Sequence, residues 1–136
     1  MVKVIIGEKG TGKTAKLIDS VNAAEKEAKG NIVFINKGDR HIFDLTHRVR
    51  IVDSVDYAIA DYSEFYGLVC GILSQNYDIS NIFVDSITKI VNSDMDALIE
   101  CLDKLNVMSD KHNAEIMVIV SMKESDAPEG LKKYIG

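Results

Sequence analysis

The chain has 136 residues, of which 46% are hydrophobic and 27% are charged, and its formal net charge is −5 at pH 7. This length suffices for one domain with a single core and is too short for two. The acidic balance argues against nucleic acid and anionic membranes as electrostatic partners. A strand-like start directly after Met1 leaves no room for a secretory signal, and no apolar run approaches the ~18 residues that span a bilayer, so we expect a cytoplasmic protein without membrane insertion.

The first half of the chain predicts three strands and a helix. Val2–Ile6 is a short apolar run suited to a buried strand. Apolar residues then recur at helical spacing over residues 13–28, and Gly30 is placed to end this helix. Asn31–Ile35 and Val49–Val52 are predicted as the second and third strands.

A second helix is predicted to begin near Asp61, which can cap it, with Glu64 three residues later completing a capping box. Gly67 and Gly71 lie four residues apart on this helix, and we interpret them as positions where the helix packs closely on the sheet. The apolar face of the helix has helical spacing and consists of Phe65, Leu68, Val69, Ile72 and Leu73.

The fourth predicted strand, Ile82–Asp85, ends in an acid. Ser93 and Asp96 resemble a second capping box, at the start of a helix that reaches about His112. We expect the segment between this strand and the next to form one amphipathic helix, with an apolar face of Met95, Leu98, Ile99, Leu102, Leu105 and Met108.

The fifth predicted strand is Ile116–Val120, which ends at Ser121, and Pro128–Ile135 is predicted as a short terminal helix. Strands that are apolar throughout and alternate with helices favour a parallel sheet covered on both faces. We therefore predict an α/β three-layer sandwich with a five-stranded, mostly parallel sheet, in a single domain over residues 1–136. Ligands in such folds bind at the carboxyl ends of the strands, where the loop after the first strand, Asp85 and Ser121 all fall.

Cys70 and Cys101 have no close-spaced partners and fall in predicted helices, and the three histidines show no metal-ligand spacing. Two free thiols in the core are the expected state of these cysteines. We expect no structural metal site.

Residues 7–14 carry the strongest motif in the chain, because G-E-K-G-T-G-K-T matches G-x-x-x-x-G-K-[ST] at every fixed position. In such a loop the backbone N–H groups form a nest for polyphosphate oxygens. Lys13 is predicted to reach the β- and γ-phosphates, and the Thr14 hydroxyl to ligate Mg²⁺. The predicted nucleotide-binding residues are Gly7, Glu8, Lys9, Gly10, Thr11, Gly12, Lys13, Thr14 and Ser121.

An acid at the end of an apolar strand completes such a site by holding Mg²⁺ through a water, and Asp85 fits this role. Its alternative is a helix cap or a strand-end turn. Ser121 either senses the γ-phosphate or caps a turn. Hydrolysis also needs a residue that activates water, and the residue after Asp85 is Ser86 rather than glutamate. Glu8 and Asp39 are the candidate catalytic bases, and each is otherwise a surface acid.

With these residues the chain resembles P-loop nucleoside triphosphatases, with residues 7–14 as the Walker A motif and Asp85 as the Walker B acid. Its layout is similar to the RecA-like branch of that family. It also resembles small stand-alone bacterial P-loop proteins labelled as twitching-motility, or pilus-retraction, ATPases. The resemblance implies a RecA-like core, ATP and Mg²⁺ as ligands, and a weak ATP hydrolase or nucleotide-dependent switch that acts through another copy or a protein partner.

Other functions stay open as alternatives. A non-hydrolysing nucleotide-binding regulatory module is favoured by Ser86. A small-molecule kinase is disfavoured, because a single helix without arginine between Asp85 and the last strand leaves nothing for a phosphate-closing lid. A GTPase is disfavoured too: residues 36–39 match the guanine motif N-K-x-D, but they precede Asp85, and no D-x-x-G occurs in the chain.

All three arginines, Arg40, Arg48 and Arg50, lie within eleven residues, in a region that also holds Lys37, His41 and His47. One arginine could act as a finger toward phosphate in a neighbouring subunit, or the region could bind an anionic partner. The interpretation we favour is a solvated loop, because charge runs are usually solvated faces. In that case the arginines pair with the nearby acids Asp39, Asp44 and Asp53.

Overall fold

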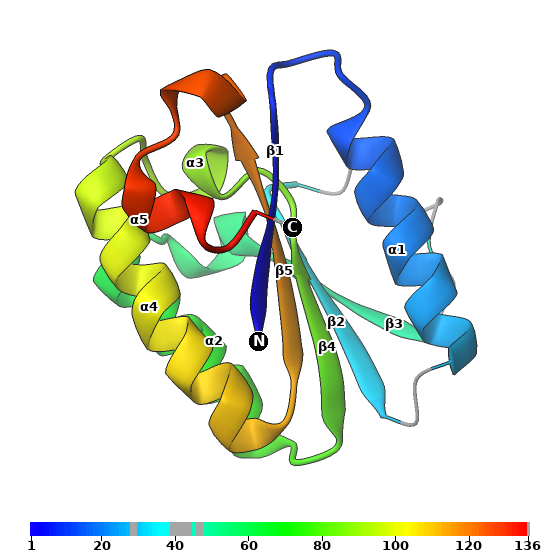
Figure 1. The fold of residues 1–136 in the computed structure, drawn as a ribbon. Coiled ribbons are helices and arrows are strands. Elements are labelled where there is room, and N and C mark those ends of the chain that lie inside the picture. The colour runs from blue at the N-terminus through cyan, green and yellow to red at the C-terminus, as the bar shows by residue number, and fades with distance from the viewer. Residues whose placement is uncertain (28–29, 39–44, 46–47, 136) are drawn as a thin grey trace.

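The computed structural model describes residues 1–27, 30–38, 45 and 48–135. Five parallel strands form one sheet in the order β1-β5-β4-β2-β3 (Figure 1). The strands are β1 (Val2–Gly7), β2 (Asn31–Asn36), β3 (Val49–Asp53), β4 (Ile79–Val84) and β5 (Glu115–Ser121). Each predicted strand is present, with ends that lie within three residues of the predictions.

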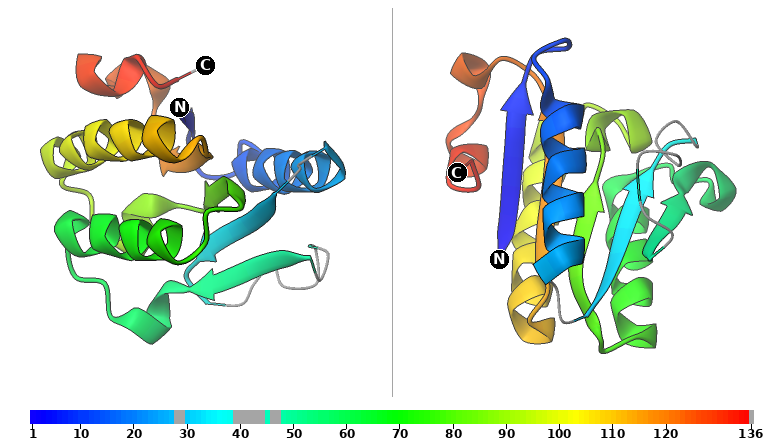
Figure 2. Two further views of the ribbon diagram at one scale, coloured as in Figure 1. Left: turned by 90° about the horizontal axis from the view of Figure 1, so that it is seen from below. Right: turned by 90° about the vertical axis from the view of Figure 1, so that its right-hand side faces the viewer.

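Helices cover both faces of this sheet, so the molecule is a three-layer α/β sandwich, as predicted (Figures 1 and 2). Helix α1 (Lys13–Glu27) packs on one face, and α2 (Tyr62–Gln75) and α4 (Met95–His112) lie side by side on the other. Four short helical segments complete the fold: η1 (Ser54–Tyr57), α3 (Ile87–Ile90), η2 (Glu124–Asp126) and α5 (Glu129–Lys132).

The strands are apolar throughout because their side chains alternate between two hydrophobic clusters. In β2, Ile32 and Phe34 contribute to the cluster under α1, whereas Val33 and Ile35 contribute to the larger cluster under α2 and α4. The smaller cluster is formed by Leu17, Val21, Ile32, Phe34, Val49, Phe83 and Ile119. A sheet buried on both faces explains why these segments show no polar alternation.

The predicted cap of α2 is confirmed, and that of α4 is wrong by one residue. The Asp61 carboxylate accepts a hydrogen bond from the Glu64 amide at 2.8 Å. Helix α4 begins after Asp94, whose carboxylate accepts from the Ala97 amide at 3.2 Å, so the predicted box of Ser93 and Asp96 does not form. The Asp94 amide also donates to the Asn92 side chain at 2.9 Å, and this turn fixes Asp94 as the cap.

Two helices occupy the stretch after β4, where one was predicted. Ser86 adopts a left-handed conformation (φ 52°) and starts the single turn of α3, which ends at Val91 (φ −110°, ψ −89°) before α4 begins. Hydrophobic periodicity could not predict α3, because this single turn contains only two apolar residues, Ile87 and Ile90, and two positions do not establish a repeat.

The end of the chain forms only one helical turn, α5, and then runs beside β1 (Figure 1). The Val4 amide donates to the Tyr134 carbonyl oxygen at 2.8 Å, and Val4 and Ile135 form a parallel bridge. The Tyr134 hydroxyl donates to the Asp103 carboxylate of α4. The described tail therefore covers the outer edge of β1, an edge strand of the sheet.

Gly67 and Gly71 do not pack on the sheet, so the predicted close packing at these positions is wrong. Both are exposed on α2, and a Cβ added to either would meet no atom within 4 Å. The sheet-facing side of α2 consists instead of Phe65, Val69 and Leu73.

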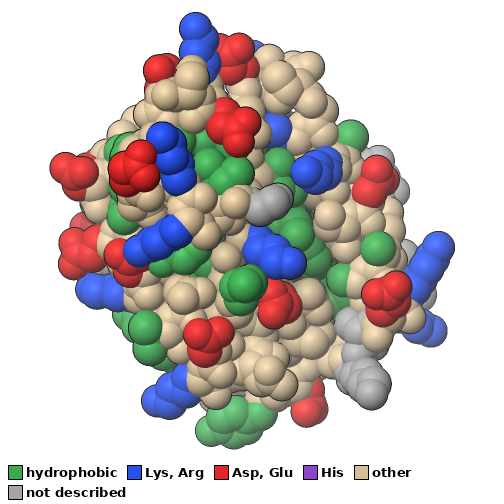
Figure 3. Space-filling model, in the orientation of Figure 1, with side chains coloured by type: hydrophobic (Ala, Val, Ile, Leu, Met, Phe, Trp, Pro, Cys, Tyr) green, Lys and Arg blue, Asp and Glu red, His purple; other side chains and the backbone are tan. Residues whose placement is uncertain are grey.

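Cys70 and Cys101 are free thiols, as predicted. Burial raises the pKa of the Cys101 thiol to about 12. No helix in the described residues is both long and apolar enough to cross a membrane. Acidic and basic side chains are interspersed over the face of the molecule in Figure 3.

Candidate functional site

The sequence-predicted site residues converge on the carboxyl edge of the sheet. Gly7, the last residue of β1, pairs with Ser121, the last residue of β5. Strand β5 also pairs with β4, and Asp85 follows the end of β4. The Asp85 amide donates to the Ile35 carbonyl oxygen of β2 at 3.0 Å. The parallel strands thus bring the glycine-rich loop, Ser121 and Asp85 to one edge.

The glycines of the loop are required for two different reasons. Gly10 and Gly12 have φ angles of 86° and 83°, in the left-handed region that favours glycine. At Gly7 the constraint is space, because an added Cβ would lie 2.7 Å from Thr11 Oγ1 and 3.4 Å from Lys13 Cδ. The backbone between β1 and α1 therefore depends on glycine at all three positions.

The loop closes on the carbonyl oxygen of Glu8. Lys13 Nζ donates to this oxygen at 2.7 Å, and Thr11 donates to it through Oγ1 at 2.7 Å and through its amide at 3.3 Å. Lys13 is only 9% exposed, whereas the Glu8 residue itself is exposed. The buried ammonium thus has one carbonyl partner in this loop, and the oxygen of a ligand can take the place of that carbonyl.

A cavity of about 500 Å³ lies against this loop. Among the residues that the structure describes, three lysines and no carboxylate line it, which suits an anionic ligand. Its lining comes from the loop, the first residues of α1, the end of β5 and the segment after β4: Lys9, Gly10, Gly12, Lys13, Thr14, Ala15, Ser86, Lys89 and Ser121.

Asp85 lies directly behind the wall of this cavity. It is 1% exposed, and Ser86 Oγ donates to its Oδ1 at 3.2 Å. Ser86 is one of few described non-glycine residues with a positive φ, and such backbone clusters at functional sites. Ser86 therefore both lines the cavity and bonds the Asp85 carboxylate.

Of the two candidate catalytic bases, Glu8 belongs to the described residues and Asp39 does not. Glu8 is exposed within the loop. Asp39 lies outside the described residues, as do Arg40, His41, Asp44 and His47. Two residues of the N-K-x-D match at 36–39 form hydrogen bonds within the protein. Lys37 Nζ donates to the Lys89 carbonyl oxygen at 3.3 Å, and the Gly38 amide donates to the Asp53 carboxylate at 2.8 Å.

Lys89 is a cavity residue that the sequence did not predict. It was missed because the one-turn helix α3, which carries it, was not expected after β4.

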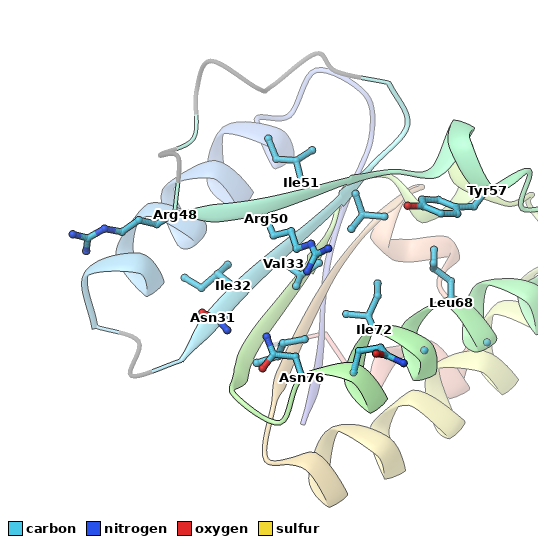
Figure 4. A pocket seen from close by; sticks show the side chains of 15 residues that line it. Asn31, Ile32, Val33, Arg48, Arg50, Ile51, Tyr57, Leu68, Ile72 and Asn76 are labelled. Atoms are coloured by element: carbon cyan, nitrogen blue, oxygen red, sulfur yellow. The ribbon is translucent and has the colours of Figure 1, made fainter.

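A larger groove of about 720 Å³ lies away from the loop, between β3 and α2 (Figure 4). It is lined by Arg50, at the amino-terminal end of β3, and by Arg48, which directly precedes this strand, opposite the edge that carries the loop. Arg48 lies 3.6 Å from Glu25 of α1, a partner that was not predicted. Asp53 accepts instead from the amides of Gly38 and Val55. Despite its size, this groove contains none of the predicted site residues.

The protein is thus an α/β sandwich. At the carboxyl edge of its sheet, the described residues bring a glycine-rich loop, three lysines and a buried aspartate together around one cavity. No protein-family model and no curated protein matches the chain.

Proposed function

We propose that this protein binds ATP with Mg²⁺ in the cavity beside the 7–14 loop and is a weak ATPase or a nucleotide-dependent switch, with the RecA-like P-loop core that its sequence resembles. The observation that carries the proposal is the cavity itself. Its lining combines the loop glycines, Lys13 and Thr14 with Ser121, and the described part of that lining contains lysines but no carboxylate. A triphosphate is negatively charged and therefore complements the charge of these lysines.

Binding would proceed through groups of the loop and the start of α1. Lys13 would exchange the Glu8 carbonyl, now 2.7 Å from its Nζ, for the β- and γ-phosphate oxygens. Thr14 and Asp85 would hold Mg²⁺, which neutralises part of the triphosphate charge when bound. Asp85 is suited to this role because its carboxylate lies one hydrogen bond behind the cavity wall.

Slow or absent hydrolysis is favoured by the residue that follows Asp85. Many hydrolases place a glutamate near this acid to activate water, whereas here Ser86 occupies the position and donates to Asp85. Positioning and charge neutralisation alone would give slow turnover. The second candidate, a non-hydrolysing regulatory module, rests on this same hydrogen bond. In either case we infer that the protein acts in the cytoplasm, through another copy or a protein partner.

The test is a calorimetric titration of the chain with Mg²⁺–ATP, together with a phosphate-release assay. Lys13→Ala should weaken ATP binding by about 10-fold or more, because a charge-assisted hydrogen bond contributes about 1.5–3 kcal/mol. Lys16→Ala removes the same charge from an exposed residue outside the cavity and should bind as the wild type does. Equal ATP affinity of Lys13→Ala and wild type would refute the assignment.

Two further arms separate the alternatives. Titration with Mg²⁺–GTP should show weaker binding than ATP, and the opposite order would return the guanine motif at residues 36–39 to consideration. Wild-type binding without phosphate release, alone or with candidate partners, would favour the regulatory module over the ATPase.

A further inference from the structure

Lys89 brings a third lysine to the cavity that is not part of the glycine-rich loop motif. It belongs to α3, lines the same cavity as Lys13 and Ser121, and is exposed. Within the described residues, no carboxylate lies close enough to Lys89 to form an ion pair with it. Its ammonium group is therefore available to a ligand in the cavity.

The backbone of Lys89 is held firmly even though its side chain is exposed. Its amide donates to the Ser86 carbonyl oxygen at 2.9 Å, and its own carbonyl accepts from Lys37 Nζ at 3.3 Å. On either side, Ile87 and Ile90 are buried in the core. The turn thus presents the lysine to the cavity from a fixed position.

The cavity has two walls, and Lys89 lies on the one that follows Asp85. Lys9 and Gly10 come from the loop, whereas Ser86 and Lys89 come from the segment after β4. If Lys13 reaches the β- and γ-phosphates and Asp85 holds the metal, the γ-phosphate lies at the end of the triphosphate nearer the second wall.

We propose that Lys89 binds the γ-phosphate from the α3 wall and thereby makes the site distinguish ATP from ADP. This inference rests on the proposed function. Enzymes of this reaction class commonly use an arginine, from the same or a neighbouring subunit, to neutralise the γ-phosphate. Arg48 and Arg50 lie at the far end of the sheet, whereas Lys89 lines the cavity from the segment that follows Asp85 and is in position for this contact.

The chemistry predicts a selective effect. ADP has no γ-phosphate, so the Lys89 contact exists only with ATP, whereas the Lys13 contact to the β-phosphate exists with both. Removing Lys89 should therefore weaken ATP binding by about 10-fold, the loss of one charge-assisted hydrogen bond, and leave ADP binding within about twofold of the wild type.

The experiment is a calorimetric titration of the whole chain with Mg²⁺–ATP and with Mg²⁺–ADP. The variants are Lys89→Ala, Lys89→Gln, Lys89→Arg and Lys13→Ala, with Lys16→Ala as a control of equal charge change. The ratio of ATP to ADP affinity should fall in Lys89→Ala and Lys89→Gln, stay near the wild-type value in Lys89→Arg, and be unchanged in Lys16→Ala. Circular dichroism confirms that each variant is folded.

Two failures are distinguishable in the same data. If the wild type binds ATP and Lys13→Ala does not, but the Lys89 variants weaken ATP and ADP equally or weaken neither, the role of Lys89 is refuted and the proposed function stands. If the wild type binds neither nucleotide, the proposed function fails, and the γ-phosphate contact fails with it.

Discussion

Replacing Gly7 by alanine tests how closely the glycine-rich loop is packed. The new Cβ would lie 2.7 Å from Thr11 Oγ1, a separation that real Cβ atoms essentially never show. The Thr11 hydroxyl must therefore move away, and it then loses its 2.7 Å hydrogen bond to the Glu8 carbonyl oxygen. No backbone strain is expected at Gly7 itself, because it is not among the glycines with a positive φ.

The cost follows from that one bond. A hydrogen bond of this kind contributes about 1 kcal/mol to stability. Unfolding entropy near the melting temperature is about 2.1 cal/mol/K per residue, so for a chain of 136 residues a loss of 1 kcal/mol lowers Tm by about 3.5 °C. Thr11→Ala removes the same bond and should lower Tm by a similar amount. In the double variant, the added methyl group no longer meets Oγ1, so its cost should equal that of Thr11→Ala alone.

The measurement is a double-mutant cycle by differential scanning calorimetry, followed by Mg²⁺–ATP titration of the same four proteins. The reasoning predicts an interaction energy of about 1 kcal/mol between the two positions, because both substitutions remove one bond. Costs that add to within about 0.3 kcal/mol would refute it, because the two residues would then not share a contact.

Three other predictions concern the rest of the fold. Gly67→Ala and Gly71→Ala should each stabilise the protein by about 1 kcal/mol, because alanine is the better helix former and the added Cβ meets nothing within 4 Å; a lower Tm for either would contradict the open surface described for α2. Stability should fall as pH rises from 9 toward 12, because the unfolded chain loses the Cys101 proton near the usual pKa of 9.0 while the folded chain keeps it up to about 12. The slope is about 1.4 kcal/mol per pH unit, and Cys101→Ala should flatten it in alkaline denaturation experiments. Tyr134→Phe removes the hydrogen bond that, with Lys133, holds the pKa of Asp103 below 3.8. A lowered carboxyl pKa stabilises the fold while the carboxyl group is ionised, and this stabilisation is lost as the pH falls through the folded-state pKa. The variant should therefore be less stable than the wild type at pH 7 and nearly equal to it in acid. Urea denaturation at the two pH values measures the difference.

The parts of the fold that could be predicted are those governed by local pattern. Apolar runs such as Val2–Ile6 and Asn31–Ile35 became strands, because a sheet buried on both faces accepts only apolar side chains. The Asp61 cap was predictable because its carboxylate bonds an amide three residues away. The positions of Asp85 and Ser121 beside the loop could also be predicted, because the carboxyl ends of parallel strands lie at the same edge of a sheet.

What could not be predicted depends on tertiary structure. The left-handed Ser86 that starts α3 is held by contacts on both sides of it in the chain, and serine does not favour this conformation by itself. Lys89 was missed with it, since its place in the cavity exists only because of that turn. Gly67 and Gly71 were misread for a different reason: the apolar face with Phe65 and Val69 meets the sheet, and both glycines lie on the opposite side of α2, where a small side chain does not indicate close packing.

The contact between the tail and β1 can open on its own, apart from the glycine-rich loop. The Val4 amide points to the outer edge of the sheet and is bonded only by the Tyr134 carbonyl among its described neighbours. Hydrogen exchange at this single amide therefore reports how often the tail detaches, apart from the unfolding of the inner strands. Strand β1 stays paired with β5 as far as Gly7 and Ser121, so detachment of the tail leaves the base of the glycine-rich loop in place. Local opening at residues 134–135 should thus occur without local opening at residues 7–14, although both segments adjoin the same strand.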